Sequence, residues 1–539
     1  MTWFRMRAGA ALGAVSAFFE RHAWLAAVLL VLVYLPAAFD ASRHAPMWHD
    51  ELFTYYIAQA PTLQQMWFDL RTLDLNPPLV YLLSRWSFAL FGVNTLAVRL
   101  PEIAGFLVWM LCTFRFVQRR MGVMFGVFAA MLLLESDLFQ FAVVARPYTL
   151  MLGFVALAMV GYQEATDGRR RLGLGLLLAG CVGMLLSHIF ALLAMAGLIL
   201  AELWSRRQRG KTDWAVLAAL VTPLAVTAIY VPMLRNHGQA IFPAAFQPDG
   251  EAIFNFYIAS VNRELVALAL TALAVLVVLG VRHLRGGPQE RGAAWFFTGA
   301  EWLTVIWMMT APLLLILDLM ASHGAFFPRY GAIATLGVVI LTTALLGRWT
   351  ISGGRLDERV GLLGAGIVLL MSGLWLVVPQ QIAAGELIPT VANSEPRVKP
   401  CEACRITAAM DASLPLVDAS GLTFMEMNHH ENAQMLDRLY YLTDKAGSTQ
   451  FAHANIFEQM QSVAERFHLR GHVAGYGDFV REHPRFFVLG RYDYPEDWLL
   501  RKLTADGAEI RVVARTSDSY RDTELYEVTV KPGRAHSGQ

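Results

Sequence analysis

The sequence predicts a polytopic α-helical membrane protein that ends in a small water-soluble α/β domain. Of its 539 residues, 56% are hydrophobic and only 16% are charged, and the mean hydropathy is +0.44. Soluble proteins carry about 25% charged residues. Up to about Gln381 the charges form short clusters between long apolar segments, whereas from about Val391 onward they are spread evenly. No apolar run in this C-terminal part reaches the roughly 20 residues that a spanning helix needs.

The membrane part, residues 1–380, contains eleven predicted spans. The first has Tyr34 and Pro36 where a cleavage site would need small residues, so it is expected to be retained. A further apolar segment, 79–91, has only about 13 residues and contains Arg85, so we expect it to lie at the membrane–water boundary. The predicted spans are residues 22–39, 98–117, 121–138, 149–165, 172–190, 191–204, 214–233, 264–281, 298–318, 328–347 and 358–378.

Basic residues predict the orientation of these spans. With the N-terminus in the cytoplasm, every basic cluster falls on the cytoplasmic side, and residues 40–97 form one large external loop with interfacial helices. Eleven spans then place the C-terminal domain outside. The net charge of +1 and the lack of a concentrated basic face argue against nucleic acid as a partner. The basic clusters are Arg5, Arg7 and Arg21; Arg115, Arg119 and Arg120; Arg169–Arg171; Arg206, Arg207, Arg209 and Lys211; Arg282, Arg285 and Arg291; and Arg348, Arg355 and Arg359.

Two adjacent carboxylates follow the first span, in the segment Trp48-His49-Asp50-Glu51. One interpretation is that Asp50 caps a helix over residues 51–59. The other is that Asp50 is a general base, with a pKa raised by partial desolvation at the membrane surface. Both interpretations remain open at this point.

Other polar residues fall on the same predicted face. Arg146 and Arg329 stand on the side that otherwise avoids arginine, either snorkelling to lipid head groups or forming an anion site. Pro328 suits the first turn of a helix, whose N-terminus beside Arg329 would favour a phosphate. His188 is either a packing residue or a functional polar group. Asn76 follows Asp74 in a Pro-Pro turn, and Asp137 ends the third span.

Five short motifs, by their order and their shared membrane face, resemble those of the GT-C glycosyltransferases of the protein O-mannosyltransferase and aminoarabinose-transferase type. The sequence is most similar to the bacterial branch labelled glycosyltransferase family 39. The resemblance covers roughly residues 20–350. The motifs are Trp48-x-Asp50-Glu51-x-x-Thr54, Asn76-Pro77-Pro78-Leu79, Arg99-Leu100-Pro101, Ala145-Arg146-Pro147-Tyr148 and Pro328-Arg329-Tyr330.

The resemblance implies a multi-pass enzyme of the bacterial inner (cytoplasmic) membrane whose active site faces the periplasm. The donor would be a polyprenyl-phosphate-linked sugar, surrounded by membrane lipids, and the acceptor a glycan, lipid or protein hydroxyl. No cofactor is certain, but some relatives use a divalent metal, which Asp50, Glu51 and His188 could ligate. The implied site residues are Asp50 and Glu51 for catalysis, Arg146, Arg329, Tyr330 and Tyr148 for the donor phosphate, and Asn76, His188, Asp137 and His49 for substrate.

Asn76 departs from the family pattern, because many relatives have His there and the aminoarabinose enzymes have Lys nearby. In the implied reaction Asp50 deprotonates the acceptor, the acceptor attacks the anomeric carbon, and the arginines stabilise the leaving phosphate, with inversion. A transporter or flippase of a lipid-linked saccharide is the alternative, although no internal repeat is visible. A membrane anchor for a binding domain is a third interpretation.

The C-terminal part divides into a linker, 381–410, with Cys401-x-x-Cys404 as an expected disulfide, and a periplasmic α/β domain, 411–539. The domain is expected to be Rossmann-like, but it has no Gly-rich loop that would indicate a nucleotide. His429 and His430 suggest either a metal cluster or, preferably, a solvated helix end. Strands are predicted at 416–418, 438–442, 486–489, 510–514 and 525–530, and helices at 455–467 and 498–506.

Overall fold

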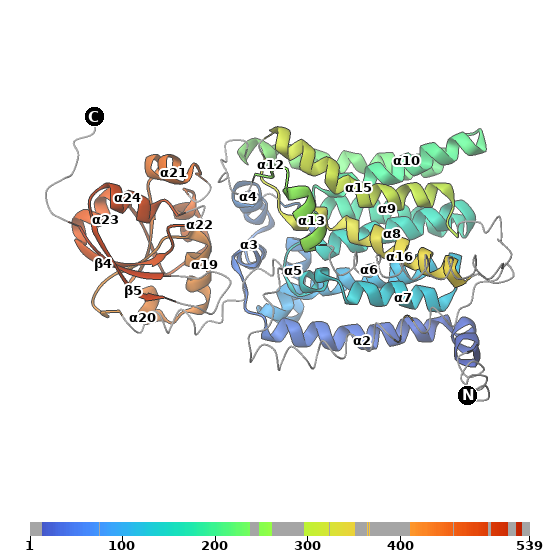
Figure 1. The fold of residues 1–539 in the computed structure, drawn as a ribbon, viewed down its shortest axis with the longest axis horizontal. Coiled ribbons are helices and arrows are strands. Elements are labelled where there is room, and N and C mark those ends of the chain that lie inside the picture. Colours follow the sequence, from blue (N-terminus) through green and yellow to red (C-terminus); the bar gives the residue numbers. More distant parts are fainter. Residues whose placement is uncertain are drawn as a thin grey trace, which may run out of the picture.

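The computed structural model consists of a helical bundle and a sheet-containing C-terminal domain that lies against one end of the bundle (Figure 1). The N-terminal helix α2 runs along the length of the bundle. The C-terminal domain packs against the short helices that follow α2. The structure describes residues 13–74, 76–237, 247–260, 296–322, 324–350, 364, 366, 410–455, 458–493, 497–515 and 524–530.

The bundle helices run roughly side by side, joined by short turns at their ends (Figure 1). Apolar side chains from α2, α6, α7, α8, α9, α10, α15 and α16 form a common buried core. The elements are α2 (Ala23–His44), α6 (Thr95–Met121), α7 (Val123–Leu134), η1 (Asp137–Val143), α8 (Tyr148–Asp167), α9 (Arg170–Ser187), α10 (Ala191–Arg209), α11 (Trp214–Val221), η2 (Thr222–Ile229), α12 (Tyr230–His237), α13 (Ala252–Ser260), α15 (Gly299–Ser322), η4 (Pro328–Gly331) and α16 (Ile333–Thr350).

Within the described residues, five helices are long and apolar enough to cross a membrane, or six if α7 and η1, bent by 73°, form one span. Predicted spans 149–165, 191–204 and 328–347 form helices α8, α10 and α16, which are shorter or more polar than those five. Predicted spans 264–281 and 358–378 lie outside the described residues. The structure therefore supports a multi-pass membrane protein without confirming eleven spans. The five helices are Ala23–His44, Thr95–Met121, Arg170–Ser187, Trp214–Arg235 and Gly299–Ser322.

Glycines allow α8 to approach its neighbours closely. A Cβ added at Gly105 would overlap the backbone of Leu150, and one at Gly153 would overlap the backbone of Gly105. On the other side of α8, a Cβ at Gly161 or Gly173 would overlap the backbone of α9 or α8, respectively. Small residues at such crossings are the usual means of packing helices in lipid, where no hydrophobic driving force acts between them. These crossings hold α8, which begins just after Arg146, in a fixed position.

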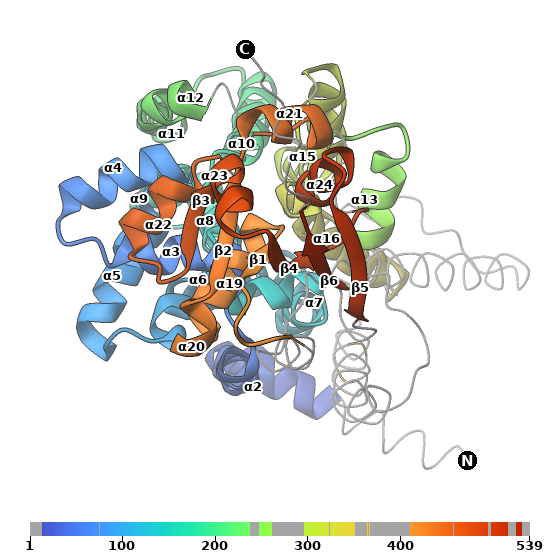
Figure 2. The same cartoon turned by 90° about the vertical axis from the view of Figure 1, so that its left-hand side faces the viewer.

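The segment between α2 and α6 forms three short helices: α3 (His49–Ala58), α4 (Leu63–Leu73) and α5 (Leu79–Phe91). Helix α5 has 13 residues and is too short to span, which agrees with its prediction as a helix within a loop. Thr62 caps α4 through a bond from Gln65 N, and Gly92, at φ 77°, ends α5. The helices of this loop lie on one side of the bundle end that faces the C-terminal domain (Figure 2), and they share an apolar cluster with that domain.

The C-terminal domain contains a six-stranded sheet of order β3-β2-β1-β4-β6-β5, in which only β6 runs antiparallel to the other described strands. The order 3-2-1-4 is that of a doubly wound α/β sheet, as expected. Cys401 and Cys404 lie outside the described residues. The elements are β1 (Leu416–Asp418), α19 (Gly421–His430), α20 (Ala433–Leu436), β2 (Leu439–Thr443), α21 (Lys445–Ala452), α22 (Met460–Phe467), β3 (His472–Gly475), α23 (Tyr476–Glu482), β4 (Arg485–Gly490), α24 (Leu499–Ala505), β5 (Glu509–Arg515) and β6 (Glu524–Thr529).

The domain and the loop helices share one buried apolar cluster. Leu52, Leu70 and Val80 of the loop belong to the same cluster as Phe424 and Phe467 of the domain. Phe467 stacks on Tyr56 with ring centroids 5.0 Å apart. The domain is therefore docked through apolar packing onto the loop that carries Asp50.

Candidate active site

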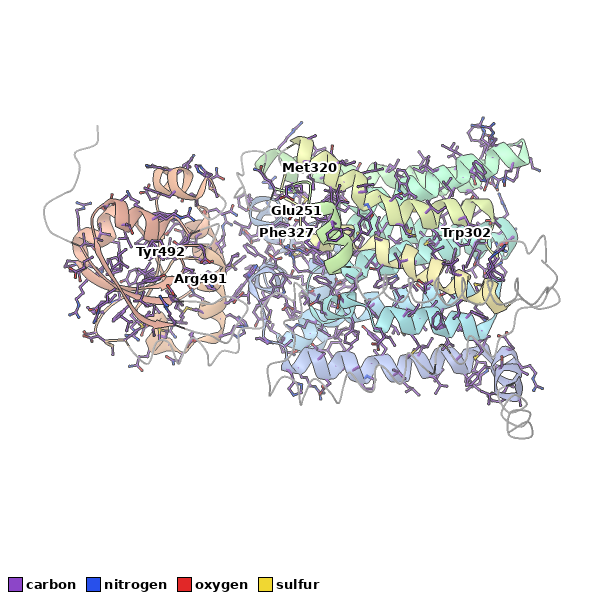
Figure 3. All side chains as sticks on the ribbon, in the orientation of Figure 1. Glu251, Trp302, Met320, Phe327, Arg491 and Tyr492 are labelled. Carbon is purple, nitrogen blue, oxygen red and sulfur yellow. The ribbon has the colours of Figure 1, made fainter. Side chains whose placement is uncertain are left out.

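The predicted site residues gather at the end of the bundle next to the C-terminal domain. The start of α3, the turn before α8 and the 3-10 turn η4 all lie at this end. Figure 3 shows Phe327, which precedes η4, at this end and Trp302 near the opposite end. Asp50, Arg146, Tyr148, His188, Arg329 and Tyr330 are joined here by the contacts described below.

Glu51 and Arg99 form a fully buried ion pair, and both side chains are 0% exposed. Arg99 Nε and Nη2 donate to the two Glu51 carboxylate oxygens at 2.7 and 2.8 Å. Arg99 also donates to the backbone carbonyls of Ser42 and Ala45, and Glu51 accepts from Ala145 N at 2.8 Å. The pair thus ties the end of α2, the start of α3, α6 and the segment before Arg146 together. This position does not suit the catalytic role predicted for Glu51, because a substrate would have to break the pair.

Asp50 lies in the first turn of α3 but does not cap it. The N-cap residue is Trp48, and its backbone N–H donates to the Glu51 carboxylate at 3.4 Å. The interpretation of Asp50 as the helix cap is therefore wrong. The Asp50 side chain is 19% exposed and accepts a hydrogen bond from Arg329 Nη2 at 3.2 Å. It is therefore the partly accessible member of the adjacent acidic pair.

The pKa of Asp50 is shifted in the direction opposite to that expected. Burial raises the pKa of this carboxyl, but the positive charges of Arg146 and Arg329, with a contribution from His49, outweigh burial and hold the pKa below its ordinary value. The sequence predicted a raised pKa of Asp50 from desolvation alone, because Arg146 and Arg329 are far from Asp50 in the sequence. Asp50 is therefore ionised and able to accept a proton.

Arg146 is fixed by an acidic partner that the sequence did not single out. Its Nη1 donates to Asp74 Oδ2 at 2.6 Å and to the Asp50 backbone carbonyl at 3.3 Å. Asn76 Nδ2 and Tyr81 Oη donate to the same Asp74 carboxylate at 2.9 and 2.6 Å. The Arg146 side chain is 9% exposed, so it points into the protein and does not snorkel. Asn76 therefore acts on Arg146 through Asp74.

Aromatic rings line the other side of Arg329. Its guanidinium lies over Phe327 at 4.5 Å from the ring centroid and over Trp48, Tyr148 and Tyr330 at 5.7 to 5.9 Å. Such faces stabilise a cation without neutralising its charge. Arg329, like Arg146, is thus held inside the protein, with its side chain only 12% exposed.

His188 completes this aromatic layer at the break between α9 and α10. Its ring lies 5.5 Å from that of Tyr148 and 6.2 Å from that of Tyr330. Its Nδ1 accepts a hydrogen bond from Phe190 N at 3.2 Å.

Arg146 Nε and Trp48 Nε1 are buried donors at the site that have no hydrogen-bond acceptor within the described part of the chain. Buried N–H groups are rarely left without a partner, and such a group requires an explanation. Both lie on side chains that surround Asp50 or Arg329. An anionic or hydroxyl-rich ligand would satisfy them.

The remaining predicted residues are placed as follows. His49 begins α3, with its Nε2 at 4.0 Å from Asp50 Oδ1. Asp137 is half-buried at the start of η1, a turn whose Phe141 contacts Tyr148 at 5.2 Å between ring centroids. Among the described residues no group of three or more His, Cys, Asp and Glu side chains could hold a metal ion. His429 and His430 are not at a solvated helix end as preferred, because they contact Tyr56 and Met47 of the first loop.

Comparisons with known proteins give one family match and a similar fold in solved structures. The family described as dolichyl-phosphate-mannose-protein mannosyltransferase matches residues 75–232, a range that includes Asn76, Arg146 and His188 but not Asp50 or Arg329. No curated protein matches the chain.

Two crystal structures of ArnT from Cupriavidus metallidurans share the fold. The structure in the apo state has a TM-score of 0.51 at 13% identity, and the structure bound to undecaprenyl phosphate has a TM-score of 0.50 at 14% identity. Each comparison covers 94% of this chain and 98% of ArnT, so the fold is shared from the membrane helices through the C-terminal domain. Residues 75–232 thus match a family of mannosyltransferases, and the chain as a whole shares its fold with ArnT.

Proposed function

We propose that this protein is an inverting glycosyltransferase that moves a sugar from a polyprenyl-phosphate donor to an acceptor hydroxyl at the periplasmic face of the membrane. The observation that carries the proposal is the cluster of Asp50, Arg146 and Arg329, in which an ionised carboxylate faces two buried guanidinium groups. The crystal structure of ArnT with undecaprenyl phosphate supports a polyprenyl-phosphate donor for this fold.

Arg146 and Arg329 suit a donor phosphate because their side chains are held inside the protein, 9% and 12% exposed, and are oriented by their neighbours. Arg146 Nε and Trp48 Nε1 offer N–H groups that no described residue accepts. A phosphate oxygen entering between Arg146 and Arg329 would compete with Asp50 for Arg329, whose bond to Asp50 is 3.2 Å long. Donor binding would therefore release the Asp50 carboxylate toward the acceptor.

The reaction would keep the charge of the site constant. The acceptor oxygen forms a bond to the anomeric carbon as the bond from that carbon to the phosphate oxygen breaks. Asp50 takes the acceptor proton and becomes neutral, while the leaving lipid phosphate gains one negative charge. Preorganised guanidinium groups that stabilise developing charge contribute more than any other single effect in many enzymes. Glu51 is held by Arg99 and Asp74 by Arg146, so neither of these neighbouring carboxylates is free to form a covalent intermediate, which favours a single inverting displacement.

Transport of a lipid-linked saccharide is the competing function. A transporter would carry its polar residues near the middle of the membrane, between structural repeats. Here helix α3, which carries Asp50, lies at one end of the bundle next to the C-terminal domain (Figure 1), and Arg146 and Arg329 contact Asp50. Their position favours an enzyme that works at one membrane face.

The test compares wild type with Asp50→Asn in release of sugar from a mixed pool of polyprenyl-phosphate sugars. General-base catalysis contributes about 10²–10⁴-fold to the rate, so Asp50→Asn should lose at least about 10²-fold while folding normally. Asp40→Asn is the matched control, because Asp40 is a mostly exposed acid ten residues earlier, at the end of α2. The sugar that wild type consumes identifies the donor.

Equal activity of wild type and Asp50→Asn would rule out Asp50 as the base. Movement of the saccharide across proteoliposomes, without release of lipid phosphate, would establish the transporter instead.

A further inference from the structure

Helix α19 of the C-terminal domain contacts the segment that carries Asp50 at three points. His430 Nε2 donates to the Met47 carbonyl at 2.7 Å, Glu426 accepts from His49, and Tyr56 Oη lies 3.3 Å from His429 Nδ1. These contacts bridge more than 370 residues of sequence. Figure 2 shows the domain in front of the loop helices at this end of the bundle. The domain therefore reaches the first turn of α3.

Glu426 makes the most specific of these contacts. Its Oε1 accepts from the backbone N–H of His49 at 3.0 Å and from His49 Nδ1 at 2.9 Å. The two side chains are only 13% and 12% exposed, respectively, so water competes weakly for these bonds. One carboxylate oxygen thus fixes both the main chain and the ring of His49.

The double contact has consequences for the next residue, Asp50. The first N–H groups of a helix have no partner inside the helix, and Glu426 supplies one at the first residue of α3. Because the Nδ1–H bonds to Glu426, His49 Nε2 is directed to the other side, 4.0 Å from Asp50 Oδ1. Glu426, His49 and Asp50 thus form a carboxylate–imidazole–carboxylate series that begins in the C-terminal domain and ends at the proposed base.

We propose that Glu426 is a positioning residue for the transfer reaction, acting through His49 to orient Asp50, so that the C-terminal domain completes the active site. This inference rests on the proposed function. It gives the domain a role at the reacting atoms that apolar docking alone would not supply.

Docking contacts elsewhere on the interface provide a matched comparison. Arg466 of α22 donates to Asp69 of α4 at 3.3 Å, and it is distant in sequence from α19 and α3. Arg466→Ala removes one charged contact between the same domain and the same loop while leaving Glu426 and His49 untouched. A general loosening of the domain would affect both contacts, whereas positioning of Asp50 depends only on the first.

The kinetic experiment uses the full-length protein with Glu426→Ala, Glu426→Gln, His49→Ala, the double variant Glu426→Ala/His49→Ala and Arg466→Ala. Misplacement of a reacting group by about 1 Å lowers rates by up to about 10²-fold, so Glu426→Ala should lower kcat by about 10- to 100-fold. The KM for the donor should not change, because Arg146 and Arg329 are untouched. Glu426→Gln should restore most of the rate, since its amide oxygen still accepts both bonds.

The double variant shows whether Glu426 acts on kcat through His49 or independently of it. If Glu426 acts through His49, the double variant should be no slower than the slower single variant. Additive losses would overturn the proposal, as would an unchanged kcat in Glu426→Ala or an equal loss in Arg466→Ala.

A measurement independent of turnover tests the same contact. Hydrogen exchange in peptides that cover residues 47–53 should accelerate in Glu426→Ala but not in Arg466→Ala. Unchanged exchange in Glu426→Ala would overturn the inference. If wild type and Asp50→Asn transfer no sugar, the proposed function fails, and the exchange result still decides whether Glu426 holds the start of α3.

Discussion

Arginines and acids form different kinds of contact at the two ends of the helical bundle. At the end farther from the C-terminal domain, the arginines of α6 face acids of α8 and α15: Arg119 lies 2.5 Å from Glu164, and Arg120 lies 2.6 Å from Asp167 and 2.8 Å from Glu301. At the domain end, Arg146 and Arg329 also face acids, but both contact the same residue, Asp50, whose side chain is 19% exposed.

The ion pairs at the two ends therefore have different roles: one set connects helices, and the other is proposed to bind a ligand. The first set of ion pairs connects α6 to α8 and α15, and its charges are used by the protein itself. The second set holds two guanidinium groups in place while leaving donors for a ligand. Ion pairs at the two ends can thus serve different purposes, and the domain end is distinguished by two arginines that both contact Asp50.

The largest effect is expected within the domain end, between the two adjacent acids. Glu51→Gln leaves Arg99 charged and fully buried without its partner, which costs about 3–5 kcal/mol of stability. Asp50→Asn removes a partly exposed carboxylate and should change stability by only about 0.5 kcal/mol. Thermal unfolding of the detergent-solubilised variants measures the difference. Equal destabilisation of the two variants would contradict the structural role of Glu51.

The second prediction compares the two ends directly. Arg146→Ala removes a proposed phosphate donor and leaves Asp74 without its guanidinium, so transfer should fall by about 10²–10³-fold. Arg120→Ala at the other end should keep the turnover within about twofold of wild type and show its effect as a lower Tm. Initial rates and melting curves of both variants provide the readout. A similar loss of turnover in both would remove the distinction between the ends.

A smaller effect concerns the pH dependence of the free enzyme. Arg329 lowers the pKa of Asp50, and the base is active only when ionised. Arg329→Gln therefore raises this pKa, and the acidic limb of kcat/KM should move to higher pH. The profile of kcat/KM against pH, with Arg120→Gln as the control, measures the shift. A limb that stays in place or moves to lower pH would show that Arg329 does not act on the base.

The smallest expected effect compares the empty and loaded states of the same site. A donor phosphate brings negative charge next to Asp50 and offsets the arginine charges, so the pKa of Asp50 should be higher in the complex than in the free enzyme. The acidic limb of kcat, which reports the complex, should then lie at higher pH than that of kcat/KM. Coincident limbs would mean that the phosphate binds away from Asp50.

Local sequence features predicted the elements that depend on short segments. The short helix at 79–91 and β1 at 416–418 occur with the predicted bounds, and the apolar run at 172–190 forms α9, from Arg170 to Ser187. Periodicity and length fix such elements because their backbone bonds close within the segment or to a neighbouring strand. The strand β3 was missed, since His472–Gly475 is short and has little apolar character.

The sequence by itself determined that this protein is a multi-pass membrane protein with a C-terminal α/β domain, and it singled out Asp50, Arg146, Arg329 and His188. Hydropathy along the chain indicated the membrane spans and the soluble domain, and the order of the motifs indicated the site residues. Only the tertiary structure decided that Glu51 is held by Arg99, that Arg146 is held by Asp74, and that Glu426 reaches His49. It also reversed the expected pKa shift of Asp50. Charges interact through space, so a carboxylate's role depends on partners from 48 to 377 residues away that no local pattern reveals.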